Sequence, residues 1–185
     1  MNQLSLFSAA LGLAAPWQVV DVRFDPAAGR IDFAIAFTPG ARFACPHCGA
    51  EHQPVHDTLE REWRHLNFFQ FQAYIHAKVA RVRCGVCGKT TQVPVPWARP
   101  TSGFTLLMEA LIVTLSQAMT VRQVAQLLAV SDMRLWRTLD HYVEQARARE
   151  DFSAVTAVGL DETAARARLH QSLSRSGRGA PAVWL

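Results

Sequence analysis

Four cysteines set the strongest limit on how this chain of 185 residues can fold. They form two pairs, Cys45-Pro-His-Cys48 and Cys84-Gly-Val-Cys87, and a glycine follows each pair. Two thiolates three positions apart on a tight turn can both face one ion, and the glycine relieves the turn. Two such turns supply the four soft ligands of a tetrahedral Zn²⁺. The pattern therefore predicts one zinc ion held by Cys45, Cys48, Cys84 and Cys87.

Other uses of the cysteines stay open at this point. Two disulfides, a redox-active pair or four buried thiols would use the same residues, and His47, His52 or His56 could replace one cysteine as a ligand. Disulfides are rare in a reducing cytoplasm, and a thioredoxin-like pair needs only one Cys-x-x-Cys. We favour zinc. Because four sulfur ligands leave no position for a substrate, the expected role of this zinc is structural.

The N-terminal apolar segment, Leu4–Ala15, bears on the cellular compartment. No lysine or arginine precedes it and the first positive charge is Arg23, so it lacks the basic start of a signal peptide. It is also shorter than the roughly 20 residues of a membrane-spanning helix. Leu4, Phe7 and Leu11 instead have the spacing of a short amphipathic helix. We therefore expect a cytoplasmic protein with reduced thiols and no membrane partner.

Two further patterns surround the cysteine pairs. Apolar residues alternate on both sides of a turn at Asp25–Gly29, which predicts a β-hairpin over Trp17–Phe37. Between the pairs, Glu60–Val82 is rich in aromatic and β-branched residues and predicts one or two strands. After the second pair, three prolines within Val93–Pro100 exclude a helix and predict a linker.

A helical period begins after this linker. It predicts helices over Phe104–Met119, over Val121–Leu128 with Thr120 as the cap, and from Met133 to about Arg149 with Ser131 or Asp132 as the cap. Leu135, Leu139 and Tyr142 are the expected core stripe of the third helix. A short helix, a tight turn and a second helix form the helix-turn-helix pattern, whose second helix enters the major groove of DNA. A plain helical bundle is the alternative.

Positive charge suggests where DNA would be contacted. The chain carries a net charge of +4, and residues 60–100 alone carry +5. Arg134 and Arg137 lie three positions apart near the start of the third helix, which makes them the candidates for base reading. The candidates for backbone contact are Arg61, Arg64, Arg81, Arg83 and Arg122, with Ser131 as a further phosphate contact unless it only caps the helix. The alternative for the strand arginines is a solvated strand face.

The C-terminal segment has a different composition. Ser153–Leu160 predicts a buried strand that ends at Asp161 and Glu162, and no Asp or Glu follows Glu162. Phosphoryl transfer by two Mg²⁺ ions needs about three carboxylates converging on one point. From Ala164 the sequence is rich in Arg, Ser and Gly, which predicts a disordered tail or a segment read out of frame. On spacing alone, Asp161 is a helix cap or a surface-turn residue.

Six segments, taken in order, resemble one family. They are Cys45-Pro-His-Cys-Gly, Trp63-Arg-His-Leu66, Arg81-Val-Arg-Cys-Gly-Val-Cys-Gly88, Val95-Pro-Trp-Ala-Arg99, Gly103-Phe-Thr105 and Val158-Gly-Leu-Asp-Glu-Thr163. In these segments the chain resembles the ISL-three family of bacterial insertion-sequence transposases. The resemblance implies a zinc-binding domain and a helix-turn-helix that together recognise the terminal inverted repeats of the element. It also implies that a DDE catalytic domain of ribonuclease-H type follows them.

The resemblance bears on catalysis as well. Asp161 matches the position of the family's first catalytic aspartate, whereas the second Asp and the third Glu are missing after Thr163. It therefore implies that Asp161 is non-functional in this chain and that Mg²⁺ belongs only to a full-length catalytic parent. Whether the chain is an enzyme stays open on these grounds.

Together these observations predict an α+β chain with a β-rich zinc-ribbon-like module, an all-α helix-turn-helix domain and an incomplete ribonuclease-H-like start. The expected domains are a helix and hairpin (1–44), a zinc-binding ribbon (45–99), a helix-turn-helix (100–150) and a truncated start of the DDE domain with an aberrant or disordered tail (151–185). The expected function is sequence-specific binding of double-stranded DNA at inverted repeats. A helix-turn-helix transcriptional regulator and a zinc-ribbon protein-interaction module are the alternatives. A homodimer, or association with an intact transposase, completes the expected partners.

Overall fold

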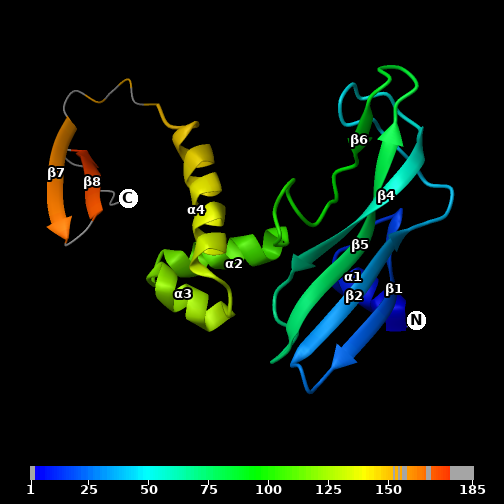
Figure 1. The fold of residues 1–185 in the computed structure, drawn as a ribbon, viewed down its shortest axis with the longest axis horizontal. Coiled ribbons are helices and arrows are strands. Elements are labelled where there is room, and N and C mark those ends of the chain that lie inside the picture. Colours follow the sequence, from blue (N-terminus) through cyan, green and yellow to red (C-terminus); the bar gives the residue numbers. More distant parts are fainter. Residues whose placement is uncertain (1–2, 152, 154, 156–157, 166–167, 176–185) are drawn as a thin grey trace. The chain divides into compact units, whose positions relative to one another are not determined.

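The computed structural model describes residues 3–151, 153, 155, 158–165 and 168–175, and for the last two ranges it describes the backbone alone. The chain divides into two compact units, Met1–Leu139 and Asp140–Leu185. Figure 1 gives the order of the helices and strands along the chain. The class is α+β, as predicted, with a β-rich N-terminal sheet followed by helices.

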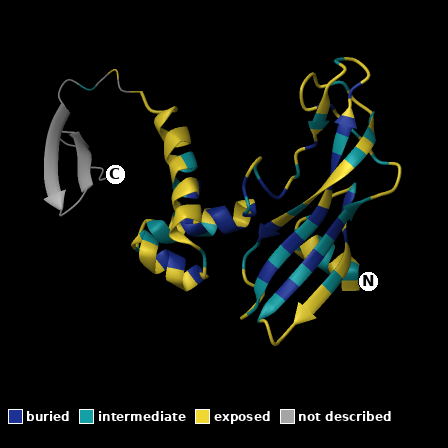
Figure 2. Cartoon of the chain, viewed as in Figure 1, coloured by how far each residue is buried: buried dark blue, intermediate teal, exposed yellow. Residues whose placement is uncertain are grey.

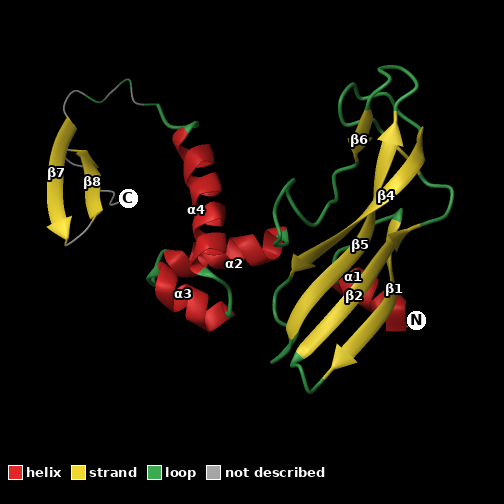
Figure 3. Cartoon of the chain, viewed as in Figure 1, coloured by secondary structure: helices red, strands yellow, loops and turns green. Residues whose placement is uncertain are grey.

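The first unit is built on a six-stranded sheet in the order β1-β2-β5-β4-β3, with β6 paired to β5 (Figure 3). The strands are β1 (Trp17–Asp25), β2 (Arg30–Phe37), β3 (Arg42–Phe43), β4 (Gln53–Arg64), β5 (Gln72–Arg83) and β6 (Thr90–Gln92). The predicted hairpin is confirmed, because β1 and β2 pair antiparallel from Trp17 opposite Phe37 to Asp25 opposite Arg30. β2 then pairs parallel with β5, so the hairpin and the strands between the two cysteine pairs share one sheet.

One face of this sheet carries the main core. Buried residues alternate along β2 at Ile31, Phe33 and Ile35, as the banding in Figure 2 shows, because successive strand residues point to opposite faces. Helix α1 (Gln3–Ala10) packs its Leu4 and Phe7 against this core, which agrees with the amphipathic spacing of the N-terminal segment. Burial of this apolar face is what holds the helix to the sheet.

The proline-rich segment after the second cysteine pair also belongs to the core. It contains no helix, as predicted, but Trp97 and Ala98 are buried against the sheet, so it is a packed segment and not a free linker. The Trp97 ring stands edge-on to Trp17 at 5.1 Å and to Trp63 at 5.6 Å between centroids. Aromatic pairs in this geometry gain energy beyond their buried area. The segment therefore ties the sheet to the helices that follow.

The three predicted helices are confirmed as α2 (Leu106–Ser116), α3 (Val121–Leu128) and α4 (Asp132–Arg147). α2 begins two residues later than predicted because Thr105 caps it, its side chain accepting from the Met108 amide. α3 has the predicted bounds, and its C-cap residue, Ala129, is in the left-handed conformation with φ of 52°. Leu135 is buried and Leu139 packs against the same helical core, as predicted, while Tyr142 belongs to the second unit.

The capping box of α3 gives a first test of the local structure. Thr120 accepts from the Gln123 amide, and the Gln123 side chain bonds back to the Thr120 amide. We expect Thr120→Ala to lower the free energy of unfolding by about 1 kcal/mol in urea denaturation. Thr114→Ala is the control, because Thr114 lies exposed inside α2 and its hydroxyl bonds only the Ala110 carbonyl. Equal effects of the two substitutions would show that the capping box does not stabilise α3.

The second unit contains two strands, β7 (Val158–Ala165) and β8 (Arg168–Arg175), which pair antiparallel. The strand predicted over Ser153–Leu160 therefore begins later, and β8 lies where a disordered tail was predicted. The register places Leu160 opposite Leu173 and Ala164 opposite Leu169. The remainder of the predicted tail, 176–185, lies outside the described residues, and a ribonuclease-H-like start is not established by two strands.

Among the residues that the structure describes, no helix combines the length and the apolar character needed to cross a membrane.

Candidate functional site

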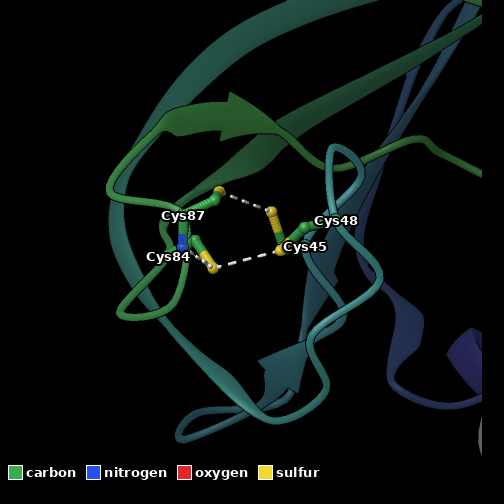
Figure 4. Close-up of side chains that lie close together, drawn as sticks. All are labelled: Cys45, Cys48, Cys84 and Cys87. Atoms are coloured by element: carbon green, nitrogen blue, oxygen red, sulfur yellow. Dashed lines mark hydrogen bonds between the residues drawn. The ribbon is translucent and has the colours of Figure 1, made fainter.

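The four cysteines lie together at one end of the sheet, as Figure 4 shows. Cys45 and Cys48 come from the loop between β3 and β4, and Cys84 and Cys87 from the loop between β5 and β6. All four Sγ atoms lie within 4.8 Å of one another. The Cys45 and Cys87 sulfurs are 3.8 Å apart, and those of Cys48 and Cys84 are 3.5 Å apart.

These distances suit a metal ion and not disulfide bonds. Zinc–sulfur bonds of about 2.3 Å in a tetrahedron place two sulfurs about 3.8 Å apart, whereas a disulfide needs about 2.05 Å. The cysteines are free thiols in the structure. Among the described residues, the group of ligand atoms around these sulfurs contains no histidine, so His47, His52 and His56 are not joined to it. The donor set and its spacing therefore fit a structural zinc.

The two cysteine turns are copies of each other in their backbone bonds. In each turn the first cysteine's amide donates to the carbonyl five positions on, and the glycine's amide donates to the first cysteine's carbonyl. The bonds are Cys45 to Ala50 (2.8 Å), Gly49 to Cys45 (2.9 Å), Cys84 to Lys89 (3.0 Å) and Gly88 to Cys84 (2.9 Å). Both glycines have positive φ, 74° and 70°, a conformation that other residues rarely adopt. This geometry explains why each pair is followed by glycine.

Backbone amides favour the thiolate at two of the four sulfurs, those of Cys45 and Cys84. The Cys48 amide, with a smaller contribution from the His47 amide, lowers the pKa of the Cys45 thiol to about 6. The Cys87 amide, and after it the Val86 amide, lowers the pKa of Cys84, and both amides lie 3.4 Å from its sulfur. Because the thiolate is the form that binds metal, these amides favour the ligand state.

A second group of ligand-type side chains, Asp32, Glu62 and His76, lies on the open face of the sheet. The Arg30 guanidinium stands among them, with Nη2 2.6 Å from Asp32, 3.0 Å from Glu62 and 3.3 Å from the His76 imidazole. Although burial raises the pKa of Asp32, its bonds with Arg30 and His76 hold that pKa below the usual value. Arg30 thus supplies the positive charge, and the group is an ion-pair network.

Arg64, a candidate for contact with the DNA backbone, is buried in the structure. Its side chain is only 2% exposed. The guanidinium donates to the carbonyls of His65 and Ala73 and to the Asn67 side chain, so it holds the chain together at the end of β4. A guanidinium that is buried and hydrogen-bonded in this way is not accessible to a phosphate in this structure.

The other strand arginines differ in their freedom. Arg81 donates from both Nε and Nη2 to Asp57, with Nε 2.6 Å from Oδ1, and it holds the pKa of Asp57 below the usual value. This acidic partner was not foreseen. Arg61 on β4 is half-buried, and its guanidinium lies 5.8 Å from the centroid of the Trp63 ring. Arg83 is exposed on the same strand as Arg81, while Val82 between them is fully buried, as the strand pattern predicts.

The helix-turn-helix carries the remaining predicted contacts. Arg122 on α3 and Ser131 before α4 are exposed. Arg137 is exposed on α4, and its Nη2 lies 3.5 Å from the Met133 sulfur. Arg134 instead donates to the Gly103 carbonyl at 3.0 Å and stacks over the Phe104 ring at 4.2 Å from its centroid. The two arginines predicted as a pair therefore have different surroundings.

Sequence reasoning missed a set of polar contacts that join the sheet to α2, which we call the junction. The Arg64 amide donates to Gly103, and the Thr105 amide donates to the Arg64 carbonyl. The imidazole of His65 lies 2.9 Å from the Thr105 hydroxyl. The junction also contains the bonds from Leu106 N to Trp97 O, from Arg99 Nε to both Glu109 oxygens and from Ser102 Oγ to Glu109 Oε1. The buried Glu109 in an apolar helix is the sequence signal that could have indicated it.

Comparison with known proteins matches two family models to this chain. The model described as the zinc-finger of transposase IS204/IS1001/IS1096/IS1165 matches residues 41–91. The model described as the helix-turn-helix domain of transposase family ISL3 matches residues 93–143. Together the two matches cover more than half of the chain, and they divide it between the cysteine turns with their strands and the helices with the proline-rich segment.

Curated relatives match as well. The transposase for insertion sequence element IS1557 of Mycobacterium tuberculosis is 25% identical over 172 residues, which are 88% of this chain and 38% of the relative. The transposase for insertion sequence element IS1001 of Bordetella parapertussis is 28% identical over 121 residues, which are 65% of this chain and 30% of the relative. The chain thus spans less than two fifths of the length of these relatives. No solved structure matches it.

Proposed function

Because the chain belongs to the ISL3 family of insertion-sequence transposases and contains its zinc-finger and helix-turn-helix domains, we propose that it recognises double-stranded DNA at the terminal inverted repeats of its element. The observation that carries this proposal is the exposed start of α4. As the second helix of a helix-turn-helix, α4 is the element that enters a major groove. Arg137 on it is accessible to base edges.

In this proposal the zinc has a structural role. Cys45, Cys48, Cys84 and Cys87 would hold it, and four sulfurs leave no place for a substrate. When bound, the ion joins the loop after β3 to the loop after β5, so the two turns keep one arrangement. The two turns lie at one end of the sheet, and the sheet is joined through the junction to α2, the first helix of the helix domain.

Phosphate contact is assigned to exposed arginines that form no ion pair within the part of the chain that the structure describes. Arg83 on β5 and Arg122 on α3 meet this condition, and the exposed Ser131 offers a hydroxyl at the start of α4. Arg81 contributes less because the Asp57 carboxylate already offsets its charge, and Arg61 contributes less because it is only partly exposed. We therefore expect the phosphate contacts to lie at the cysteine end of β5 and on the helices.

The test of this function is a selection from a randomised duplex library by the zinc-loaded chain, followed by footprinting on the ends of the insertion element that encodes it. We expect one sequence to be enriched, and the same sequence to be protected within both terminal repeats. The proposal fails if no sequence is enriched, or if the enriched sequence is absent from the ends.

Substitution of the phosphate-contacting arginines should weaken binding to all sequences alike. Arg83→Ala and Arg122→Ala should each lower the slope of log K against log salt by about 1 in anisotropy titrations. Arg23→Ala is the control, because this arginine is highly exposed and pairs with Asp21 on β1. If Arg23→Ala changed the slope as much as the other two, the assignment of the phosphate contacts would be wrong.

We also propose that the chain alone does not cut DNA. Asp161 lies on β7, opposite Ser172, and residues 163–185 contain no further carboxylate side chain. Two-metal phosphoryl transfer needs about three converging carboxylates. Incubation with Mg²⁺ and a duplex that carries the selected sequence should give no nicking on a denaturing gel. Cleavage by the purified chain would overturn this. A ribonuclease-H-like role for the second unit, and Mg²⁺ binding, are proposed only for a full-length transposase.

Partners other than DNA follow from the symmetry of the target. Inverted repeats are two copies of one site, so two copies of the chain, or one copy and an intact transposase, would occupy the two ends. Light scattering of the chain with one and with two repeats on a duplex measures this directly. We expect two chains to bind the duplex that carries two repeats.

A further inference from the structure

The first two turns of α4 present one exposed stripe. Met133, Trp136 and Arg137 are spaced i, i+3 and i+4, which places them on one side of a helix. The side chains of Met133 and Trp136 are 64% and 52% exposed although both are large and apolar. Leu135 and Thr138, on the other side, are buried in the helical core. The stripe is therefore the surface that α4 offers to a groove.

Arg134 does not belong to this stripe. Its guanidinium donates to the Gly103 carbonyl and covers the ring of Phe104, which is itself buried. The same Gly103 carbonyl accepts the Arg64 amide at 2.9 Å, so one oxygen joins β4 to α4. These two contacts hold the guanidinium at the junction, so a bidentate bond from Arg134 to a base would compete with them.

We propose that Arg134 is a positioning residue, which fixes α4 to the junction, and that Met133, Trp136 and Arg137 determine the DNA sequence that is read. This inference rests on the proposed function. The guanidinium of Arg137 suits O6 and N7 of guanine, and the apolar surfaces of Met133 and Trp136 suit thymine methyl groups. The preferred site therefore contains a guanine with neighbouring thymines in the part read by α4.

Gly103 offers a variant that moves Arg134 without removing it. A Cβ at this position would lie 3.0 Å from Nη2 and 3.9 Å from Cζ of Arg134, and it would meet no other side chain of the described residues within 4 Å. The guanidinium is the flexible end of a long side chain, so it would shift by a few tenths of an ångström while keeping its charge. Gly103→Ala is thus a test of position, and Arg134→Gln is a test of position and charge together.

The experiment measures the affinity and base preference of each variant with the duplex selected by the wild-type chain and with all single-base changes of it. Arg137→Gln should lose its preference at one guanine, by roughly 10- to 100-fold. Arg134→Gln should weaken binding to the selected duplex about tenfold, since it removes a hydrogen bond of a charged group. It should leave the base preferences and the salt slope unchanged.

Three comparisons distinguish positioning from reading. Gly103→Ala should lower the affinity for the selected duplex, as Arg134→Gln does. The double variant Gly103→Ala with Arg134→Gln should bind no more weakly than Arg134→Gln alone, because both substitutions act on one contact. Arg134→Lys should restore part of the affinity, since its amine can still reach the Gly103 carbonyl. Arg147→Gln removes a charge from the last turn of α4 and should change neither the affinity nor the base preference.

The inference is overturned if Arg134→Gln relaxes a single base position, lowers the salt slope by about 1, or has no effect on affinity. It is also overturned if Gly103→Ala, which keeps both arginines, relaxes the preference at a single base. Should Arg134→Gln fail to fold in circular dichroism, Gly103→Ala and Arg134→Lys carry the same test. Failure of the wild-type chain to select any sequence would instead refute the proposed function itself.

Discussion

Cys84→Ser is expected to abolish zinc binding and to unfold the cysteine end of the sheet, residues 41–55 and 83–93. Few apolar residues hold this end together. Its cluster contains only three buried residues, Ala80, Val82 and Val93, while the main cluster contains twelve. Where the apolar core is this small, metal-binding energy becomes folding energy, and structural zinc in finger peptides contributes roughly 10–16 kcal/mol. The substitution therefore removes the largest single contribution to the order of this end.

Hydrogen exchange with mass spectrometry measures the extent of the change. We expect rapid exchange in 41–55 and 83–93, with protection kept in β1, β2 and α2–α4. The near-ultraviolet dichroism of Trp17, Trp63 and Trp97 should also persist, because these rings stack within the main core. A chelator added to the wild-type chain should give the same pattern. Unchanged zinc content in Cys84→Ser would show that this cysteine is not a ligand.

The second large effect is expected from Glu109→Ala, with a loss of about 3–5 kcal/mol in the free energy of unfolding. Glu109 is 0% exposed, and it accepts from Arg99 and from the Ser102 hydroxyl. Its removal leaves the Arg99 guanidinium, which is 20% exposed, without the carboxylate beside it. Removal of one partner of a buried pair costs more than the pair contributes, because the remaining charge is not compensated.

Two variants sharpen this measurement by urea denaturation. The double variant Arg99→Met with Glu109→Met should recover much of the loss, since an apolar pair leaves no buried charge. Glu60→Ala is the matched control, because Glu60 forms an exposed pair with Lys78 and should change stability by less than about 1 kcal/mol. If Glu109→Ala were no more destabilising than Glu60→Ala, the junction would not hold the sheet and the helices together.

Most of the features that could be predicted from the sequence are local ones. Thr120 and Gln123 are three positions apart, so the start of α3 is legible without the rest of the fold. The same holds for the turn between β1 and β2 and for the cysteine turns, whose spacing alone defines the candidate zinc ligands. These features depend on contacts within a few residues, which composition and periodicity describe well.

What could not be predicted depends on contacts distant in sequence. Asp57 offsets the charge of Arg81 because the register of β4 and β5 places them opposite each other, 24 positions apart. A strand register cannot be read from a row of basic residues. Arg64 and Arg134 look like surface charge in the sequence, and only the fold reveals that they bond to carbonyls of Ala73 and Gly103. The net charge of a segment therefore overestimates how many of its arginines are free to contact DNA.

The measurement that tests DNA recognition most directly is a salt titration of the zinc-loaded chain with the selected duplex and with a scrambled duplex of the same composition. Phosphate contacts require log K to fall linearly with log salt for both duplexes. Base reading by α4 requires the selected duplex to bind about a thousandfold more tightly, or better, at physiological salt. Equal affinities for the two duplexes, or an affinity that does not change with salt, would contradict the account.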